Sequence, residues 1–274
     1  MENDLLPLSK SWVIRMLFLD MIYGEKSGYQ AIGYIQAQDK KYLSDDILAA
    51  LDCAQNYIKG NHVYDVRNAG TVCRFLVYIM QGKKYELRLG EQLQRRIKKW
   101  PDNLNKLSVA ELLKLGTSQY ASAALLLGAE PTEKLHPKCL LAVEARKAYF
   151  ENGGKWLSRY DEVIVGQLEN FLYKKEIKSP IAEDYCYLRA FNLITHDEGQ
   201  KQWPELANHE SNRLKVMEEI CVDFDRQIEA PDDHRVVMAV ALRQTSLGLP
   251  VRVSNKECVA KSWPQFWVWL GRNA

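Results

Sequence analysis

Apolar residues recur at helical spacing in several windows of the chain. The windows that predict helices cover residues 11–23, 44–58, 70–81, 118–128, 137–152, 181–195, 211–221, 235–246 and 263–272. Shorter β-type runs lie between them and predict strands: YELRL (85–89), EVIVG (162–166) and VRVS (251–254). Helical and strand-like segments that alternate along a chain are typical of α/β proteins. The pattern therefore predicts an α/β fold.

The length and composition are ordinary for a globular protein. A chain of 274 residues can form one large domain or two smaller ones, and the polar stretch YKKEIKSP (173–180) is the best candidate for a junction. Hydrophobic residues make up 47% of the chain and charged residues 26%. The net charge is only +2, so nothing global indicates nucleic acid or a membrane surface as a partner. Any anion would have to bind to a local cluster of cations.

The cysteines and histidines do not form a metal-binding or disulfide pattern. The six cysteines are scattered without a C-x-x-C pair, and the five histidines give no H-E-x-x-H motif. Arg15 and Asp20 interrupt the apolar run SWVIRMLFLDMIYG (11–24), which argues against a signal peptide or a membrane span. We expect reduced thiols, no metal, no cofactor and a cytoplasmic location.

Candidate chemistry lies where Lys or Arg stands beside small or hydroxyl residues at the boundary of an element. In YDVRNAGTVCRFLVYI (64–79), polar residues run into an apolar helical segment, and Arg74 follows in its first turn. A helix N-terminus has unpaired N–H groups and the positive end of a dipole, which suits an anion. For this stretch taken alone, a capped helix with a surface arginine is the more common explanation. Similar stretches are PLSKSWVIR (7–15), GTSQYASAALLL (116–127), NHESNRLKVMEEI (208–220), DDHRVVMAVAL (232–242) and ECVAKSWPQFW (257–267).

In this order the stretches resemble the motifs of the 5-enolpyruvylshikimate-3-phosphate (EPSP) synthase family. SKSWVIR is similar to the family's S-K-S-x-x-x-R, NAGTVCRFL to N-A-G-T-x-x-R-F-L, and TSQ to S-S-Q. LGEQLQRRI is similar to the arginine-containing segment that follows. HESNRL resembles K-E-[ST]-D-R-L, DDHRVVM resembles D-H-R-x-x-M, and ECVAKSWP resembles C-x-x-K-[ST]-F-P. The resemblance spans Pro7 to Trp267. The related UDP-N-acetylglucosamine enolpyruvyl transferases fit less well, because they have K-N where this chain has S-K-S.

The resemblance implies a two-domain enolpyruvyl transferase fold of βαβαββ units with ligands bound between the domains. The first domain would be residues 11–175, and the second would be residues 1–10 plus 176–274. The chain is too short between TSQY and HESNR to hold all the expected units, so the second domain would be reduced. An apolar face exposed by that loss would favour an oligomer.

The implied reaction transfers the enolpyruvyl group from phosphoenolpyruvate to the 5-hydroxyl of shikimate 3-phosphate and releases phosphate. By resemblance, phosphoenolpyruvate would bind Lys10, Asn68, Gly70, Thr71, Arg96, Arg213, Arg235 and Lys261. Shikimate 3-phosphate would bind Ser11, Arg15, Thr117, Ser118, Gln119 and His209. Catalysis would use Lys10, Glu210 and His234. Catalysis would rest on positioning and electrostatics, without a metal or a covalent nucleophile.

The chain departs from the family pattern at several positions. Ile181 stands where the family has a catalytic aspartate, and Glu183 or Asp184 could replace it only with a shifted register. Asn212 replaces the aspartate of K-E-[ST]-D-R. Two alternatives therefore stay open. One is a non-catalytic or regulatory relative that binds phosphoenolpyruvate-like anions, and the other is an enolpyruvyl transferase with another acceptor.

Overall fold

The chain forms two compact units, each with a hydrophobic core of its own. The computed structural model describes residues 5–97, 100–133, 135–208 and 211–273. The N-terminal unit is Leu8–Arg159, and the C-terminal unit is Tyr160–Ala274 together with Met1–Pro7. The polar stretch 173–180 lies inside the C-terminal unit. The chain thus passes between the units at Pro7–Leu8 and again at Arg159–Tyr160.

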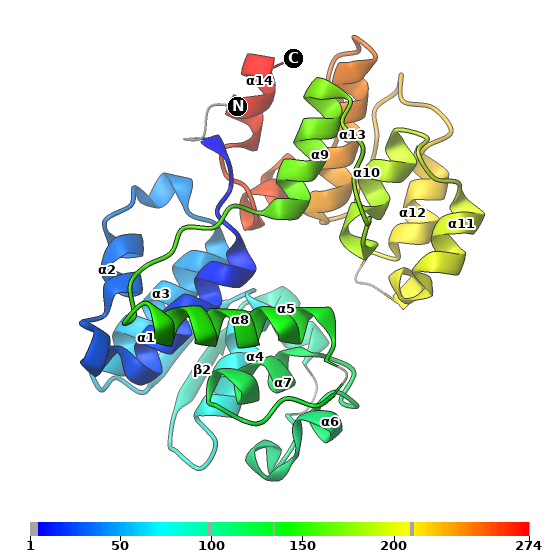
Figure 1. The fold of residues 1–274 in the computed structure, drawn as a ribbon. Helices are drawn as coiled ribbons and strands as arrows, with labels where there is room; N and C mark the ends of the chain where they lie inside the picture. Colours follow the sequence, from blue (N-terminus) through cyan, green and yellow to red (C-terminus); the bar gives the residue numbers. More distant parts are fainter. Residues whose placement is uncertain (1–4, 98–99, 134, 209–210, 274) are drawn as a thin grey trace. The chain divides into compact units, whose positions relative to one another are not determined.

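Helices make up most of the N-terminal unit (Figure 1). Its elements are α1 (Lys10–Ser27), α2 (Gln30–Gln36), η2 (Lys40–Tyr42), α3 (Asp45–Ile58), β1 (Val63–Arg67), α4 (Gly70–Ile79), β2 (Glu86–Leu89), α5 (Glu91–Arg96), η3 (Leu104–Lys106), α6 (Val109–Leu112), α7 (Gln119–Leu126) and α8 (Pro137–Glu151), where η marks a 3-10 helix.

Helix α1 forms the centre of this unit because its apolar residues lie on every side of it. Such a helix cannot leave one face in water, and α1 packs against α2, α3 and α8. Its buried Asp20 accepts hydrogen bonds from the Tyr149 hydroxyl at 2.8 Å and the Ile32 amide at 2.9 Å. Burial raises the pKa of Asp20. The core is therefore built mainly by helix against helix.

Strands β1 and β2 form a parallel pair in the N-terminal unit, with α4 as the connection between them. Val63 lies opposite Glu86 and Asp65 lies opposite Arg88, before the register shifts near Arg67. A parallel pair requires a crossover of this kind. This β1–α4–β2 segment brings the end of β1 directly to the first turn of α4.

The C-terminal unit contains helices and short 3-10 turns in the part that the structure describes. Its elements are α9 (Glu162–Tyr173), η4 (Ala182–Asp184), α10 (Tyr185–Ala190), α11 (His196–Gln202), η5 (Pro204–Asn208), α12 (Arg213–Ile220), α13 (His234–Ser246), η6 (Lys256–Lys261) and α14 (Phe266–Asn273). Its core includes the buried side chains of Trp263, Phe266 and Trp269. Helix α13 packs against α10 and η6.

The expectation of an α/β fold built from βαβαββ units was wrong. The described residues are mostly helical, and their strands form a single two-stranded parallel sheet. The run 162–166, expected as a strand, opens helix α9. Asp161 caps α9 by accepting a hydrogen bond from the Ile164 amide at 3.1 Å, and Ile164, Leu168 and Phe171 are buried at helical spacing.

The run 251–254 was also expected as a strand, and it forms one isolated parallel bridge between Val253 and Ile228. The expected strand at 85–89 was correct, since β2 covers Glu86–Leu89. A strand needs a partner of suitable length beside it, and a run of four or five β-type residues carries no information about such a partner. Among the described helices, none is long and apolar enough to cross a membrane.

Candidate functional site

The expected site residues divide between the two units. The N-terminal unit holds Lys10, Ser11, Arg15, Asn68, Gly70, Thr71, Arg96, Thr117, Ser118 and Gln119. The C-terminal unit holds Arg213, His234, Arg235 and Lys261. His209 and Glu210, as well as the side chain of Arg96, lie outside the described residues. The backbone of Arg96 ends helix α5.

Five of the motif stretches provide the first residue of a helix. Helix α1 begins at Lys10, α4 at Gly70, α7 at Gln119, α12 at Arg213 and α13 at His234. The first amides of a helix have no partner within it, and the helix dipole is positive at this end. The prediction that these stretches lie at element boundaries is confirmed. Each places small, polar or cationic side chains where an anion is favoured.

The first turns of α4 and α7 are joined by side-chain hydrogen bonds. The Gln119 amide nitrogen donates to the Thr71 hydroxyl at 2.7 Å, and Arg74 Nη1 donates to the Gln119 amide oxygen at 2.8 Å. Arg74 Nη1 also donates to the Gly70 carbonyl at 3.3 Å. The Thr117 hydroxyl accepts from the Gln119 backbone amide. Two helix N-termini, a guanidinium and two hydroxyl groups are thus brought together.

Arg15 connects α1 to α7 inside the N-terminal unit. Its guanidinium donates to the Ser11 carbonyl at 2.8 Å and to the Ser122 hydroxyl at 3.3 Å, and it lies 5.5 Å from the ring centre of Phe75. Only 4% of the Arg15 residue is exposed, and burial lowers its pKa to about 10. Arg15 therefore stabilises the packing of these helices, in addition to any role toward a ligand.

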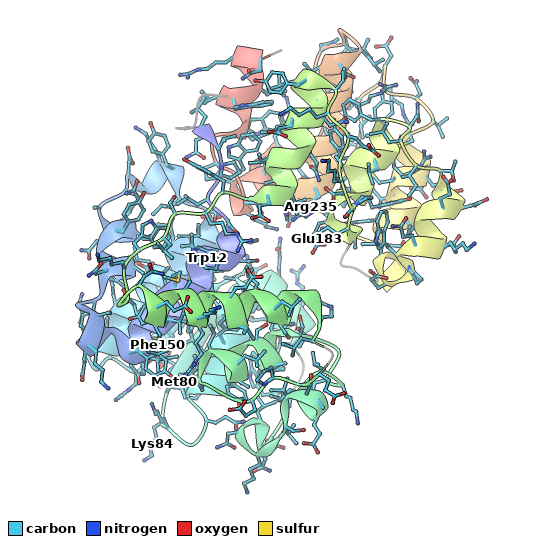
Figure 2. The ribbon with its side chains drawn as sticks, viewed as in Figure 1. Trp12, Met80, Lys84, Phe150, Glu183 and Arg235 are labelled. Atoms are coloured by element: carbon cyan, nitrogen blue, oxygen red, sulfur yellow. The ribbon has the colours of Figure 1, made fainter. Side chains whose placement is uncertain are left out.

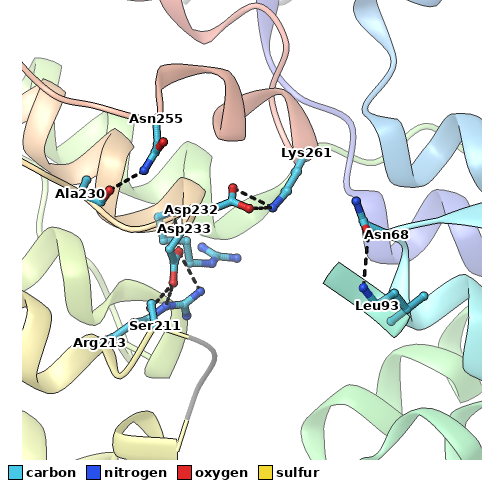
Figure 3. A network of polar contacts seen from close by, with 10 residues as sticks. Asn68, Leu93, Ser211, Arg213, Ala230, Asp232, Asp233, Asn255 and Lys261 are labelled. Carbon is cyan, nitrogen blue, oxygen red and sulfur yellow. Dashed lines mark hydrogen bonds and ion pairs between the residues drawn. The ribbon is translucent and has the colours of Figure 1, made fainter. Parts of the chain in front are cut away.

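Lys10 and Asn68 also have partners within the N-terminal unit. Lys10 forms an ion pair with Asp46 at 2.9 Å, and both side chains are half-buried. The Asn68 side-chain oxygen accepts from the Leu93 amide at 3.2 Å, which holds the start of α5 against the β1–α4 loop (Figure 3). A Cβ atom at Gly90 would lie 2.4 Å from the Asn68 side-chain oxygen, so only glycine fits there. The Asn68 contact therefore fixes the local backbone.

Arg213 and Asp233 form a buried ion pair in the C-terminal unit (Figure 3). Arg213 donates through Nε at 2.7 Å and Nη2 at 3.1 Å to the two oxygens of Asp233, and the Ser211 hydroxyl donates to the same carboxylate at 2.6 Å. Burial alone would raise the pKa of Asp233. The charge of Arg213 and these hydrogen bonds outweigh burial, so the pKa of Asp233 is held well below its usual value. Both groups are therefore charged over the neutral pH range.

Arg235 lies beside the same carboxylate. Its backbone amide donates to Asp233 at 3.0 Å, where Asp233 caps α13, and its Nη1 donates to the Glu183 carbonyl at 3.4 Å. Arg235 and Glu183 are labelled in Figure 2 and lie next to each other in the C-terminal unit. The first turns of α12 and α13 are thus linked through one aspartate, with Arg213 and Arg235 around it.

The acidic residues near Ile181 have different environments. Asp184 is buried and accepts from the Gln167 amide at 2.8 Å and from the Ile181 backbone amide at 3.0 Å. Burial raises the pKa of Asp184. Its oxygens stabilise the turn in which it lies. Glu183 is half-buried, and its charge acts on both Asp184 and Arg213.

Lys261 contacts the second acidic residue of the Asp232–Asp233 pair. Its ammonium lies 2.8 Å from both carboxylate oxygens of Asp232, and both side chains are half-exposed (Figure 3). The two consecutive aspartates therefore bring Arg213, Arg235 and Lys261 into one cluster at the start of α13. We call these five residues the acidic-pair cluster.

Sequence reasoning assigned the basic residues and missed the carboxylates that hold them. Asp46, Asp232 and Asp233 had no assigned role, and Arg74 was noted without one. A signal was present in DDHR, because an aspartate directly before a helix start is a strong N-cap signal. Asp46 gave no comparable signal, since its contact with Lys10 joins α3 to α1 across 36 positions of sequence.

The potential metal ligands are dispersed in the part of the chain that is described. Within it, no three His, Cys, Asp or Glu side chains are grouped so that they could hold a metal ion. The six cysteines are free thiols, and burial raises the pKa of Cys186, which lies near Arg213, to about 12. The chemistry that this arrangement supports is the binding of anions by cations and helix N-termini.

Comparison with known proteins adds no family to this description. No protein-family model, no curated protein and no solved structure matches the chain.

Proposed function

We propose that the protein binds phosphoenolpyruvate and shikimate 3-phosphate in the cytoplasm, transfers the enolpyruvyl group to the 5-hydroxyl of the acceptor and releases phosphate. One observation carries the proposal most strongly. Motif residues that the resemblance assigns to ligand binding or catalysis begin five helices, at Lys10, Gly70, Gln119, Arg213 and His234. Both substrates carry a phosphate and a carboxylate, and such groups are favoured at helix N-termini and beside arginine. The βαβαββ scaffold is no part of this proposal.

The acidic-pair cluster provides the cations for phosphoenolpyruvate in this proposal. Asp233 fixes the guanidinium of Arg213, so little side-chain entropy remains to be lost on binding. Lys261 is half-exposed and can move its ammonium from Asp232 to an incoming anion. Lys10, paired with Asp46, provides the corresponding cation of the N-terminal unit.

Residues at the start of α7 form the proposed acceptor side, and Gln119 among them contacts Thr71, which the resemblance assigns to phosphoenolpyruvate. Thr117, Ser118 and Gln119 would contact the phosphate and ring of shikimate 3-phosphate, and the first amides of α7 favour the phosphate charge. The acceptor hydroxyl adds to C2 of phosphoenolpyruvate while C3 gains a proton. Loss of phosphate and of a proton from C3 then restores the double bond. Glu210 is the proposed group for these proton transfers, with Lys10 and His234 in support.

A binding protein without turnover is the second candidate. Ile181 stands at the position of the expected catalytic aspartate, and the oxygens of Asp184 are engaged within their own turn. Three of the proposed cations, Lys10, Arg213 and Lys261, already have carboxylate partners, which an anion must displace or share. A third candidate keeps enolpyruvyl transfer with another acceptor.

Phosphate release from phosphoenolpyruvate separates these candidates. We expect release that requires shikimate 3-phosphate and falls by about 10- to 100-fold in Lys261→Ala, because a charged hydrogen bond to the substrate is lost. Lys256→Ala is the matched control, since Lys256 belongs to the same 3-10 helix and contacts the Val251 carbonyl and the Trp267 ring. The binding of phosphoenolpyruvate is measured separately by calorimetric titration.

The outcomes assign the function. Binding of phosphoenolpyruvate without phosphate release would favour the non-catalytic relative. Release with other hydroxyl acceptors, but not with shikimate 3-phosphate, would favour a different acceptor. Absence of both binding and release at millimolar concentrations would refute the proposed function.

A further inference from the structure

A cavity of about 330 Å³ lies in the N-terminal unit, between the end of α7 and the last turns of α8. Leu125 and Val143 contribute apolar walls, and the ring of Phe150 (labelled in Figure 2) is 47% exposed beside them. Cavities of this volume can enclose a small molecule. Helix α7 has eight residues and is about 12 Å long, with Gln119 at its start and Leu125 near its end, and the residues that line the cavity do not include Thr117, Ser118 or Gln119. The cavity is therefore separate from the residues assigned to shikimate 3-phosphate.

Arg146 lines the cavity with a guanidinium whose hydrogen-bonding capacity is unused. The guanidinium lies 4.9 Å from the ring centre of Phe150. Its Nε atom is buried without a hydrogen-bond partner, and no ion pair joins Arg146 to another residue in the described ranges. Gly128 has a φ of +95°, and a Cβ atom there would lie 2.9 Å from Nη2. Glycine at this position thus allows the guanidinium to lie close against the backbone.

Among the other charged residues that line the cavity, only Glu130 is a carboxylate without an ion pair to a described residue. Lys147 and Glu151 form an ion pair at 3.7 Å across one helical turn and offset each other. Glu130 is exposed on the loop after α7 and makes no ion pair with any described residue. The cavity therefore offers one cation, one carboxylate and apolar walls.

We propose that this cavity binds a free amino acid with a bulky apolar side chain. The carboxylate of the ligand pairs with Arg146, because a guanidinium offers two parallel donors to a carboxylate. The ammonium group pairs with Glu130. The side chain lies between Leu125, Val143 and the Phe150 ring, where its apolar surface leaves water. A simple anion fits less well, since Glu130 would repel it without offering a partner charge. This binding is independent of the enolpyruvyl transfer proposed above.

Calorimetric titration of the full chain with L-phenylalanine tests the proposal. The matched probes are 3-phenylpropionate, which lacks the ammonium group, and 2-phenylethylamine, which lacks the carboxylate. We expect L-phenylalanine to bind at least about tenfold more tightly than either, because each analogue loses one charged contact. The titration is done without phosphoenolpyruvate, so its result does not depend on the proposed function.

Two substitutions assign the contacts. Glu130→Gln and Arg146→Gln should each weaken the binding of L-phenylalanine by about tenfold. Glu133→Gln is the matched control, because Glu133 is exposed on the same loop and does not line the cavity. Glu130 is exposed, so its substitution leaves the fold intact even if Arg146→Gln fails to fold. Absence of heat with L-phenylalanine at millimolar concentrations, equal binding of 3-phenylpropionate, or unchanged binding in Glu130→Gln would each overturn the proposal.

Discussion

Three of the cations proposed to bind phosphoenolpyruvate are held in place by carboxylates. Asp46 holds Lys10, Asp232 holds Lys261, and Asp233 holds Arg213. The first two pairs are partly exposed and add little to stability, whereas Asp233 and Arg213 are buried. Removal of one partner from a buried pair leaves an unpaired charge in the interior. Asp233 orients the Arg213 guanidinium that is proposed to bind phosphoenolpyruvate, and it therefore also stabilises the C-terminal unit.

The buried pair predicts a pH dependence of stability. The pKa of Asp233 is held below its ordinary value of 3.8 in the folded state, so the folded state binds fewer protons near that pH. The stabilisation is complete above pH 3.8 and is lost as the pH falls through and below it. We expect the free energy of unfolding of the C-terminal unit to drop by about 2 kcal/mol between about pH 5 and pH 2.

A double variant isolates this contribution. Arg213→Gln with Asp233→Asn replaces the charged pair by neutral amides, so the stability of the double variant should vary less over the same pH interval. Both the parent protein and the double variant also carry Asp184→Asn. Burial raises the pKa of Asp184, so this residue would make stability change with pH in the opposite direction. Urea unfolding followed by tryptophan fluorescence measures both slopes. Equal slopes in the two proteins would contradict the role given to the pair.

The placement of several candidate site residues at helix starts could be predicted from sequence, but the partners of these residues could not. Small and hydroxyl residues before an apolar run marked the starts of α4 and α7, because capping chemistry is local. The contact between Arg74 and Gln119 joins residues 45 positions apart and left no local signal. Likewise, the burial of Arg15 depends on helices packed around α1, which its own stretch does not specify.

At the scale of elements, helices were predictable where the apolar repeat was long. The window 235–246 matches α13 (His234–Ser246), and 70–81 matches α4 (Gly70–Ile79). The window 181–195 was predicted as one helix, but α10 covers only Tyr185–Ala190, and Asn192 has a φ of +56°, which a helix cannot contain. The strand predicted at 162–166 was wrong because its apolar residues continue at helical spacing into α9. A short stretch of sequence is therefore not enough to distinguish a helical repeat of apolar residues from a strand-like one.

Capping gives a prediction at this scale. The Thr195 hydroxyl accepts from the Glu198 amide at 3.2 Å, and the Glu198 carboxylate accepts from the Thr195 amide at 2.8 Å, which forms a capping box at the start of α11. Thr195→Ala should lower the free energy of unfolding by about 1 kcal/mol, because it leaves a helix amide without its partner. Thr195→Ser keeps the hydroxyl and serves as control. Urea unfolding compares the two, and equal losses would show that the methyl group matters instead.

At the scale of the whole molecule, the fold could not be predicted from the motifs. The resemblance implied sheets in both domains, whereas the described core of each unit is formed mainly by helices that pack on helices. Motif residues lie at helix starts, and a helix start of this kind is compatible with either architecture. The two cores are separate sets of residues, which run from Trp12 to Tyr149 and from Ile164 to Leu270.

Separate cores predict separate unfolding. Differential scanning calorimetry should show two transitions, each shifted by substitutions in one unit only. Tyr149→Phe removes a hydrogen bond to buried Asp20 and should lower the transition of the N-terminal unit, by about 1 kcal/mol. Arg213→Ala should lower the other transition by about 3 to 5 kcal/mol. A single transition that both variants shift equally would mean that the chain unfolds as one cooperative body.

The C-terminal unit is discontinuous, and this affects the order in which it can fold. The Trp263 indole donates to the Leu5 carbonyl at 2.7 Å, and the Asp161 amide donates to the Pro7 carbonyl at 2.9 Å. A ribosome therefore makes Leu5 and Pro7 before the whole N-terminal unit. Asp161, the partner of Pro7, follows directly after that unit, but Trp263, the partner of Leu5, emerges near the end of synthesis. The N-terminal unit, continuous from Leu8 to Arg159, can fold while translation continues. Premature termination anywhere before Trp263 would release a chain whose N-terminal segment lacks this partner.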